Sequence, residues 1–131
     1  AAEVKQALEA VATVGRVDVS RSPAAPAGFV YMVTFTTNVG DVAELQIDAA
    51  LVGGGGGASN RVASVVQVVQ GKPPSFDQGT VGINVMPLGM MVTSPQNEVQ
   101  TITATTGAED LDGTFTVTFM GLTTLPISIH A

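Results

Sequence analysis

Residues 29–36 read FVYMVTFT and carry the clearest strand signal in the chain. The large apolar side chains of Phe29, Tyr31, Val33 and Phe35 occupy every second position. Successive side chains of a strand point to opposite faces of a sheet, so this period of two places all four on one face. We interpret that face as part of a hydrophobic core. The alternative is a sugar-binding platform formed by Phe29 and Tyr31.

Shorter strand patterns extend along most of the remaining chain. They cover residues 16–20, 44–48, 61–70, 80–86, 90–93, 99–105, 114–119 and 126–129. Loop signals separate them, including RSPAAPAG at 21–28 and five glycines at 53–57. Residues 61–70 (RVASVVQVVQ) are apolar and β-branched on both faces, which predicts a largely buried strand.

The first twelve residues, AAEVKQALEAVA, have a different period. Val4, Ala7, Leu8 and Val11 are spaced to form one apolar stripe on an amphipathic helix that ends at or before Gly15. A helix of about three turns is too short to be stable alone in water, so it must pack on another element. It begins without a capping residue, as if the chain started inside a helix.

These patterns predict a mainly β, α+β protein, in which one short N-terminal helix packs on an antiparallel β-sheet or sandwich. The Pro-containing stretch KPPSFD at 72–77 suggests an internal boundary. We therefore expect a helix-plus-β unit over 1–71, completed by 113–131 from the same or a neighbouring subunit. Residues 72–112 form a second β-rich segment.

Composition excludes several classes of function. Only 12% of the 131 residues are charged, and five scattered basic residues leave a net charge of −6. This provides no basic surface for nucleic acid or for an anionic membrane. No apolar run approaches the ~20 residues of a membrane span. A sparsely charged, Thr-rich surface suits a protein covered by partner subunits or by sugar, as in a glycoprotein. The alternative is an ordinary polar surface on a β-protein.

Catalytic and metal-binding patterns are also weak. The chain has one His, His130, and no Cys, and no set of nucleophile, base and orienting group is evident. We therefore assign no catalytic residue, no cofactor and no enzymatic activity. Asp110 and Asp112, just before Gly113, partly resemble a Ca²⁺ loop, but the 12-residue loop and its terminal Glu are missing. A solvated acidic turn is the alternative.

Joining the end of the chain to its start gives an ordered series of motifs. They are GTFTVTF at 113–119, TTLPI at 123–127, AAEVKQALEAV at 1–11, VDVSR at 17–21, YMVTF at 31–35 and NVGDV at 38–42. This series resembles a tandem repeat of very large extracellular proteins of heterokont algae and oomycetes, with related units in bacterial and phage surface proteins. The resemblance spans roughly two thirds of the chain. It implies an extracellular structural repeat and no enzyme.

The expected function is therefore self-assembly, head to tail, into an extracellular filament or surface fibre. A terminal strand pair can complete a neighbouring subunit by β-augmentation. The predicted interface joins the last strands to the helix and comprises Phe115, Val117, Phe119, Ile127, Ile129, Val4, Leu8 and Val11. The only partners expected are further copies of the chain and surface glycans. A carbohydrate- or receptor-binding adhesion module is the alternative.

Overall fold

The computed structural model describes residues 1–52, 61–76, 92–106 and 111–131. In these ranges it contains one helix and ten strands. They are α1 (Ala2–Glu9), β1 (Val17–Pro23), β2 (Ala27–Phe35), β3 (Gln46–Val52), β4 (Val62–Val69), β5 (Ser75–Phe76), β6 (Val92–Thr93), β7 (Val99–Thr106), β8 (Asp112–Phe119), β9 (Leu122–Thr123) and β10 (Ile127–Ser128). The glycine run and the candidate strand at 80–86 lie outside the described residues.

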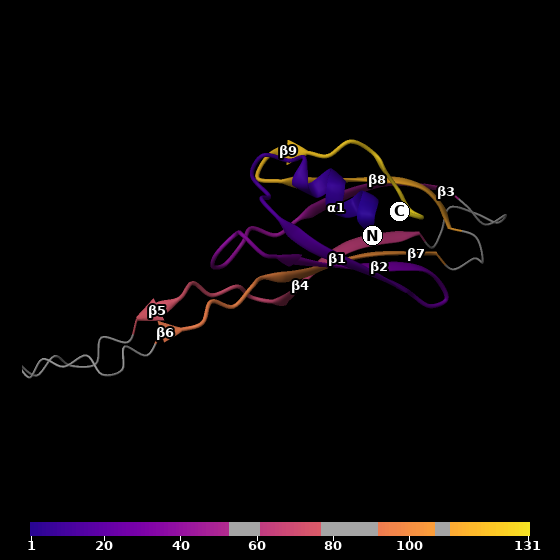
Figure 1. The fold of residues 1–131 in the computed structure, drawn as a ribbon. Helices are drawn as coiled ribbons and strands as arrows, with labels where there is room; N and C mark the ends of the chain where they lie inside the picture. The colour runs from indigo at the N-terminus through magenta and orange to yellow at the C-terminus, as the bar shows by residue number, and fades with distance from the viewer. Residues whose placement is uncertain (53–60, 77–91, 107–110) are drawn as a thin grey trace, which may run out of the picture.

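The strands form two antiparallel sheets that face each other (Figure 1). The first, here called sheet A, has the order β1-β2-β7-β4. The second, sheet B, has the order β10-β8-β3, and β9 pairs with β8. A separate two-stranded ribbon pairs β5 with β6. The predicted α+β class, with paired sheets and one N-terminal helix, is confirmed.

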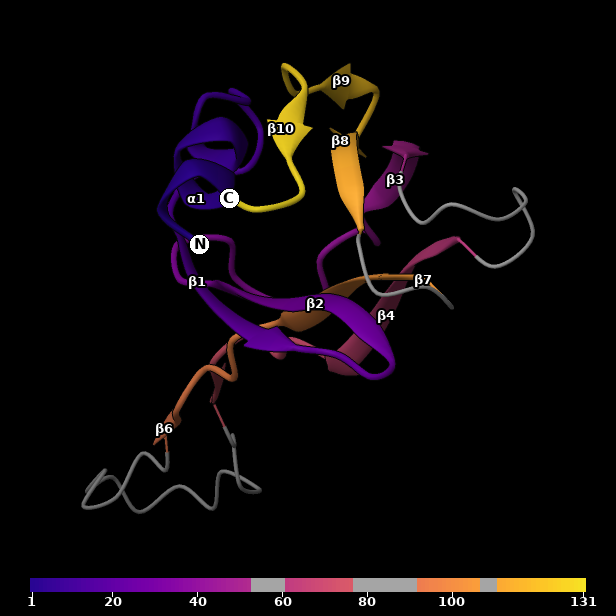
Figure 2. The ribbon, with the colours of Figure 1, turned by 90° about the vertical axis from the view of Figure 1, so that its right-hand side faces the viewer.

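The two sides of the sandwich differ. Helix α1 contacts β1 and β10, and so packs beside both sheets at one side. On the opposite side the edge strands β3 and β4 contact each other directly (Figure 2). The helix is shorter than the predicted 1–12, but Val4, Leu8 and Val11 are buried as its apolar stripe requires.

The core lies between the sheets and is centred on β2 and β8. Tyr31 packs on Phe115 with ring centroids 5.7 Å apart, and Phe35 packs on Phe119 at 5.8 Å. Tyr31, like Val33 between the two aromatics of its strand, has no exposed surface. The interpretation of the 29–36 stretch as core is confirmed, because a buried Tyr31 cannot serve as a binding platform.

Strand β4 differs from its prediction as a largely buried strand. Its side chains at Val62, Val66 and Val68 are 56%, 53% and 53% exposed. The physical reason is the position of β7, which pairs with β2 on one side and with β4 on the other. That insertion moves β4 to the edge of sheet A, whose outer face carries no second layer in the described structure. The prediction of burial is wrong.

The same topology bears on the boundary expected at 72–77. Sheet A combines β1, β2 and β4 with β7, which comes from the other side of that stretch. Sheet B combines β3 with β8, β9 and β10 from the last part of the chain. Both sheets therefore draw strands from before and after residue 72, and their pairing takes place within one chain.

Candidate functional site

Glu98, the residue just before β7, is a fully buried carboxylate with four hydrogen-bond donors. Its Oε1 accepts hydrogen bonds from Gln67 Nε2 at 2.7 Å and from Gln100 Nε2 at 3.0 Å. Its Oε2 accepts from the backbone N–H of Gly71 at 2.7 Å and of Val42 at 3.3 Å. The Glu98 carboxylate, which can only accept hydrogen bonds, thus pairs with N–H donors from β4, from β7 and from two connecting segments.

The electrostatics of Glu98 follow from these contacts. Burial by itself raises the pKa of a carboxyl group, because it disfavours the charged form. The hydrogen bonds from Gly71, Gln67, Gln100 and Val42 outweigh burial and lower the pKa of Glu98 below its ordinary value of 4.5. Its negative charge is held by N–H donors of backbone and amide groups.

Gln100 extends this network to the segment that crosses from sheet A to sheet B. Its Oε1 accepts from the backbone N–H of Leu45 at 2.8 Å, and its Nε2 donates to the carbonyl of Ala43 at 3.1 Å. Gln100 is itself fully buried. Glu98 and Gln100 therefore hold residues 41–45 against sheet A, as backbone pairing does elsewhere.

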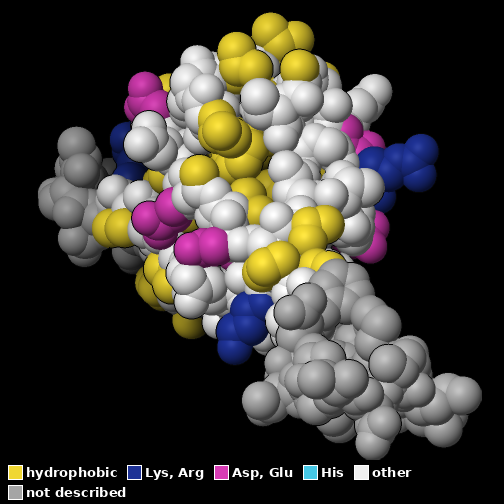
Figure 3. Space-filling model, turned by 90° about the vertical axis from the view of Figure 1, so that its left-hand side faces the viewer, with side chains coloured by type: hydrophobic (Ala, Val, Ile, Leu, Met, Phe, Trp, Pro, Cys, Tyr) yellow, Lys and Arg dark blue, Asp and Glu magenta, His cyan; other side chains and the backbone are white. Residues whose placement is uncertain are grey.

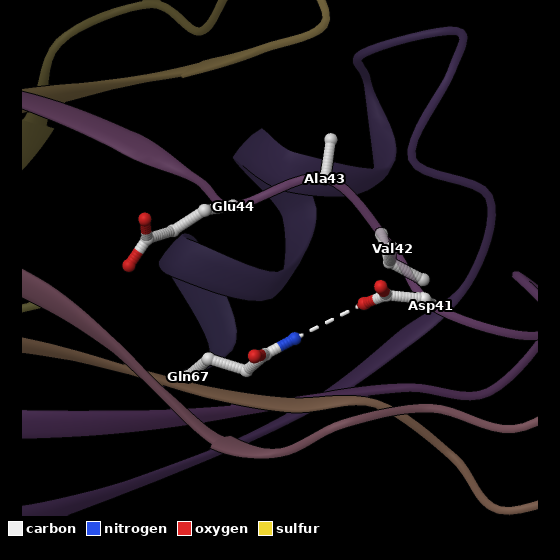
Figure 4. A pocket seen from close by; sticks show the side chains of 5 residues that line it. All are labelled: Asp41, Val42, Ala43, Glu44 and Gln67. Carbon is white, nitrogen blue, oxygen red and sulfur yellow. Dashed lines mark hydrogen bonds between the residues drawn. The ribbon is translucent and has the colours of Figure 1, made fainter.

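Above this network lies an open hollow of about 420 Å³, lined by Asp41, Val42, Ala43, Glu44 and Gln67 (Figure 4). Gln67 Nε2 donates to Asp41 Oδ1 at 3.2 Å, and Gln70 Nε2 donates to Asp41 Oδ2 at 2.9 Å. The two acidic residues that line the hollow, Asp41 and Glu44, are exposed. It is an acidic, solvent-open depression beside the edge strand β4, suited to receiving a basic side chain.

Of the two predicted metal candidates, one lies within the described residues. Asp110 lies outside the described residues. Asp112 is exposed, accepts a hydrogen bond from the backbone N–H of Gly113 at 2.7 Å and lies 3.6 Å from His130 Nε2. Within the described ranges, no group of three or more His, Cys, Asp or Glu side chains is placed to hold a metal ion. Asp112 therefore accepts from the adjoining backbone at the start of β8, and the interpretation of the pair Asp110 and Asp112 stays a prediction.

The eight predicted interface residues all belong to one buried cluster within a single chain. The residues of the last strands pack together with the residues of the helical stripe. The first group is Phe115, Val117, Phe119, Ile127 and Ile129, and the second is Val4, Leu8 and Val11. The structure therefore brings the predicted set together.

Two polar side chains that sequence reasoning missed hold the last residues in place. The hydroxyl of Tyr31 donates a hydrogen bond to the carbonyl of Ile129. Arg21 donates to the carbonyls of His130 and Ala131, and its guanidinium lies 4.6 Å from the ring centroid of Phe29. A buried Tyr needs a partner for its hydroxyl, so the pattern at 29–36 signals that such a partner exists without identifying it.

An apolar groove runs between α1 and the segment that connects β9 to β10. It has a volume of about 630 Å³ and is lined by Glu3, Gln6, Ala7, Ala10, Val11, Ala12, Leu122, Thr123, Thr124, Leu125, Pro126 and Ile127. Leu125 is 83% exposed and Leu122 is 44% exposed. Figure 3 views the molecule from the side on which β9 lies in Figure 1, and hydrophobic side chains gather across that face.

Comparison with known proteins does not extend this description. No protein family, curated protein or solved structure matches the chain. In the parts of the chain that the structure describes, no helix combines the length and the apolar character that crossing a bilayer requires. The fold defines the class as a β-sandwich-like α+β protein, and function has to be argued from its surfaces.

Proposed function

We propose that this chain is a non-enzymatic structural subunit that assembles head to tail into an extracellular filament or surface fibre. The observation that carries the proposal is the packing of α1 against the last strands. Leu8 and Val11 share one buried cluster with Ile127 and Ile129. The two ends of the chain also lie side by side in both ribbon views (Figures 1 and 2).

Exchange of the last strands between copies would conserve these contacts. Strand β8 pairs with β3 from Asp112 to Thr118, and β10 pairs with β8 through Ile127 and Ser128. A neighbour that supplies its own β8–β10 segment would make the same pairs and fill the same core. Domain swapping and strand addition assemble subunits in this way, with few new contacts needed.

Composition and motif order support the extracellular part of the proposal. The surface is sparsely charged, and the motif order resembles that of extracellular tandem repeats. In that repeat order the TTLPI strand precedes the helix directly, and here β10 packs against α1. The adhesion alternative loses its proposed platform, because Tyr31 is fully buried and Phe29 is stacked beneath Arg21.

Crosslinking between chains tests the proposal. Ala7 and Leu125 line the same groove, and the chain has no native Cys. Two single-cysteine variants, Ala7→Cys and Leu125→Cys, are mixed at high concentration, annealed and treated with a short thiol–thiol crosslinker. We expect crosslinked heterodimers in the mixture, because exchanged strands place Leu125 of one copy beside Ala7 of another.

The matched control replaces Leu125→Cys by Ala50→Cys, an exposed position on β3 outside the groove. A double variant with both groove cysteines in one chain establishes that the crosslinker spans the groove. Efficient crosslinking within that double variant, with no heterodimer above the control in the mixture, would contradict head-to-tail exchange.

A further inference from the structure

Strand β4 is an edge strand that has one unpaired side in the described structure. It ends sheet A, and its eight residues, VASVVQVV, include no charged residue and no proline. The opposite edge strand, β1, is flanked by α1 and includes Pro23. Exposed edge strands are templates for pairing with another chain, and proteins that stay monomeric blunt them with charge, proline or cover. Within the described residues, β4 has no strand paired on its free side and its pairing with β7 is irregular only between Gln67 and Val69, although β3 of sheet B contacts β4.

The geometry of the strand restricts how a second copy can pair with it. Residues directly opposite in an antiparallel pair lie on the same face of the sheet. The pairing of β4 with β7 places Val62, Ser64 and Val66 on the outer face and Ala63, Val65 and Gln67 on the inner face. If two copies pair through a twofold axis, one residue of β4 must therefore lie opposite the same residue of the other copy. An axis that passes between two successive residues would place side chains of opposite faces across from each other. The central candidates are Ala63, Ser64 and Val65.

The register centred on Ser64 brings together two of the three exposed valines of β4. It places Val62 of each copy opposite Val66 of the other. These side chains are 56% and 53% exposed in the single chain. Cross-strand pairs of β-branched residues stabilise sheets, so this register covers apolar surface on both copies at once.

The positions of the charged side chains favour the same register. Arg61, just before β4, then lies opposite Gln67 of the other copy, and Gln67 lines the hollow that carries Asp41 and Glu44. Centring on Ala63 would place Arg61 opposite Val65, and centring on Val65 would place it opposite Val69 beyond the irregularity. The Ser64 register sets the guanidinium opposite Gln67, whose side chain itself donates to Asp41, and twofold symmetry makes this contact twice.

We propose that β4 is a homotypic docking edge. A second copy of this chain adds its β4 antiparallel, centred on Ser64, and extends sheet A across the two molecules. Arg61 of each copy occupies the Asp41–Glu44 hollow of the other. This sideways contact uses none of the residues of the head-to-tail contact, so it would join filaments or subunits laterally.

Disulfide trapping tests the register. Directly opposed residues in antiparallel strands have Cα atoms about 4.5–5.5 Å apart, within the range that a disulfide spans. Ser64→Cys should form a covalent dimer under mild oxidation, because residue 64 faces its own copy. Val62→Cys alone and Val66→Cys alone should give no disulfide-linked dimer, whereas a mixture of the two should give the mixed disulfide.

A charge exchange tests the second contact without cysteine chemistry. Arg61→Glu and Glu44→Lys should each weaken dimer formation by about tenfold or more in sedimentation experiments, since each places like charges together. The double variant, Arg61→Glu with Glu44→Lys, should restore it. Asp18→Lys reverses a charge on the remote strand β1 and should leave association unchanged.

The outcomes separate this proposal from the proposed function. A Ser64→Cys chain that stays monomeric, equal crosslinking at all three cysteine positions, or no rescue in the double charge variant would each overturn docking through β4. None of these results bears on the crosslink between positions 7 and 125. Failure of that crosslink with a positive Ser64 result would leave a lateral dimer and no head-to-tail filament.

Discussion

Glu98 shows how a single residue can tie four segments together. Its sequence context, NEVQ at 97–100, gives no sign that the carboxylate is buried. Its donors at Val42, Gln67 and Gly71 are far from it in sequence, so only the fold brings them together. Periodicity identifies apolar side chains that need burial, but it does not reveal which polar side chain enters a core with its partners.

Replacement of this carboxylate should destabilise the fold. In Glu98→Gln, one acceptor oxygen becomes an NH₂ group that faces N–H donors. We expect a loss of about 2 kcal/mol in the free energy of unfolding at neutral pH, because a buried hydrogen bond to charge is broken and donors are left unsatisfied. Urea denaturation measures the loss, and Asp48→Asn, on an exposed residue outside the hollow, is the control that should change little.

The pH dependence of that difference has a definite sign. The pKa of Glu98 is lowered on folding, so the folded state keeps the charge at pH values where the unfolded chain binds a proton. The stabilisation is present above the ordinary pKa and is lost as pH falls through the lowered one. The difference between wild type and Glu98→Gln should therefore shrink as pH falls below 4.5. A difference that grows with acid would contradict this assignment.

At the scale of elements, the sequence predicted most of what depends on local period. Strand β2 has its alternating face in the core, and the stripe at Val4, Leu8 and Val11 is buried. Strand β4 could not be predicted in the same way, because VASVVQVV looks the same at the centre of a sheet and at its edge. Its position depends on β7, which follows it in the chain and occupies the inner place in sheet A.

Helix α1 should depend on packing for its stability. Eight residues are too few for a helix to persist alone, and its end at Ala1 has no side-chain cap. Leu8 is fully buried, so Leu8→Ala should lower the free energy of unfolding by about 2–5 kcal/mol. Gln6→Ala, on an exposed position of the same helix, should change it by less than about 0.5 kcal/mol in thermal or urea unfolding. Similar losses for both variants would contradict the conclusion that burial of Leu8 stabilises α1.

At the scale of the whole molecule, the two sides of the sandwich differ: a helix covers one side, and two edge strands in contact form the other. Helix α1 packs beside β1 and β10, whereas β3 and β4 are edge strands on the other side. The apolar groove lies on the side of the helix, and the acidic hollow lies on the side of β4. Two surfaces with different chemistry fit a subunit that associates along one direction through apolar contacts and sideways through strand pairing.

The candidate surfaces were only partly predictable at this scale. The sequence indicated that the last strands and the helix belong together, because their apolar residues follow one repeat order. It did not indicate the hollow beside β4, since Asp41, Glu44 and Gln67 are brought together by the crossing segment and an edge strand. A surface feature formed by separate segments depends on the order of strands in the sheets. Composition and hydrophobic periodicity do not predict that order.

Electron microscopy of the concentrated, annealed protein tests the central claim most directly. We predict filaments with a single axial repeat, because each copy contributes the same β8–β10 segment to the next. Images that show only separate particles, together with a sedimentation mass that stays at the 13.3 kDa of one chain at the same concentration, would contradict the account.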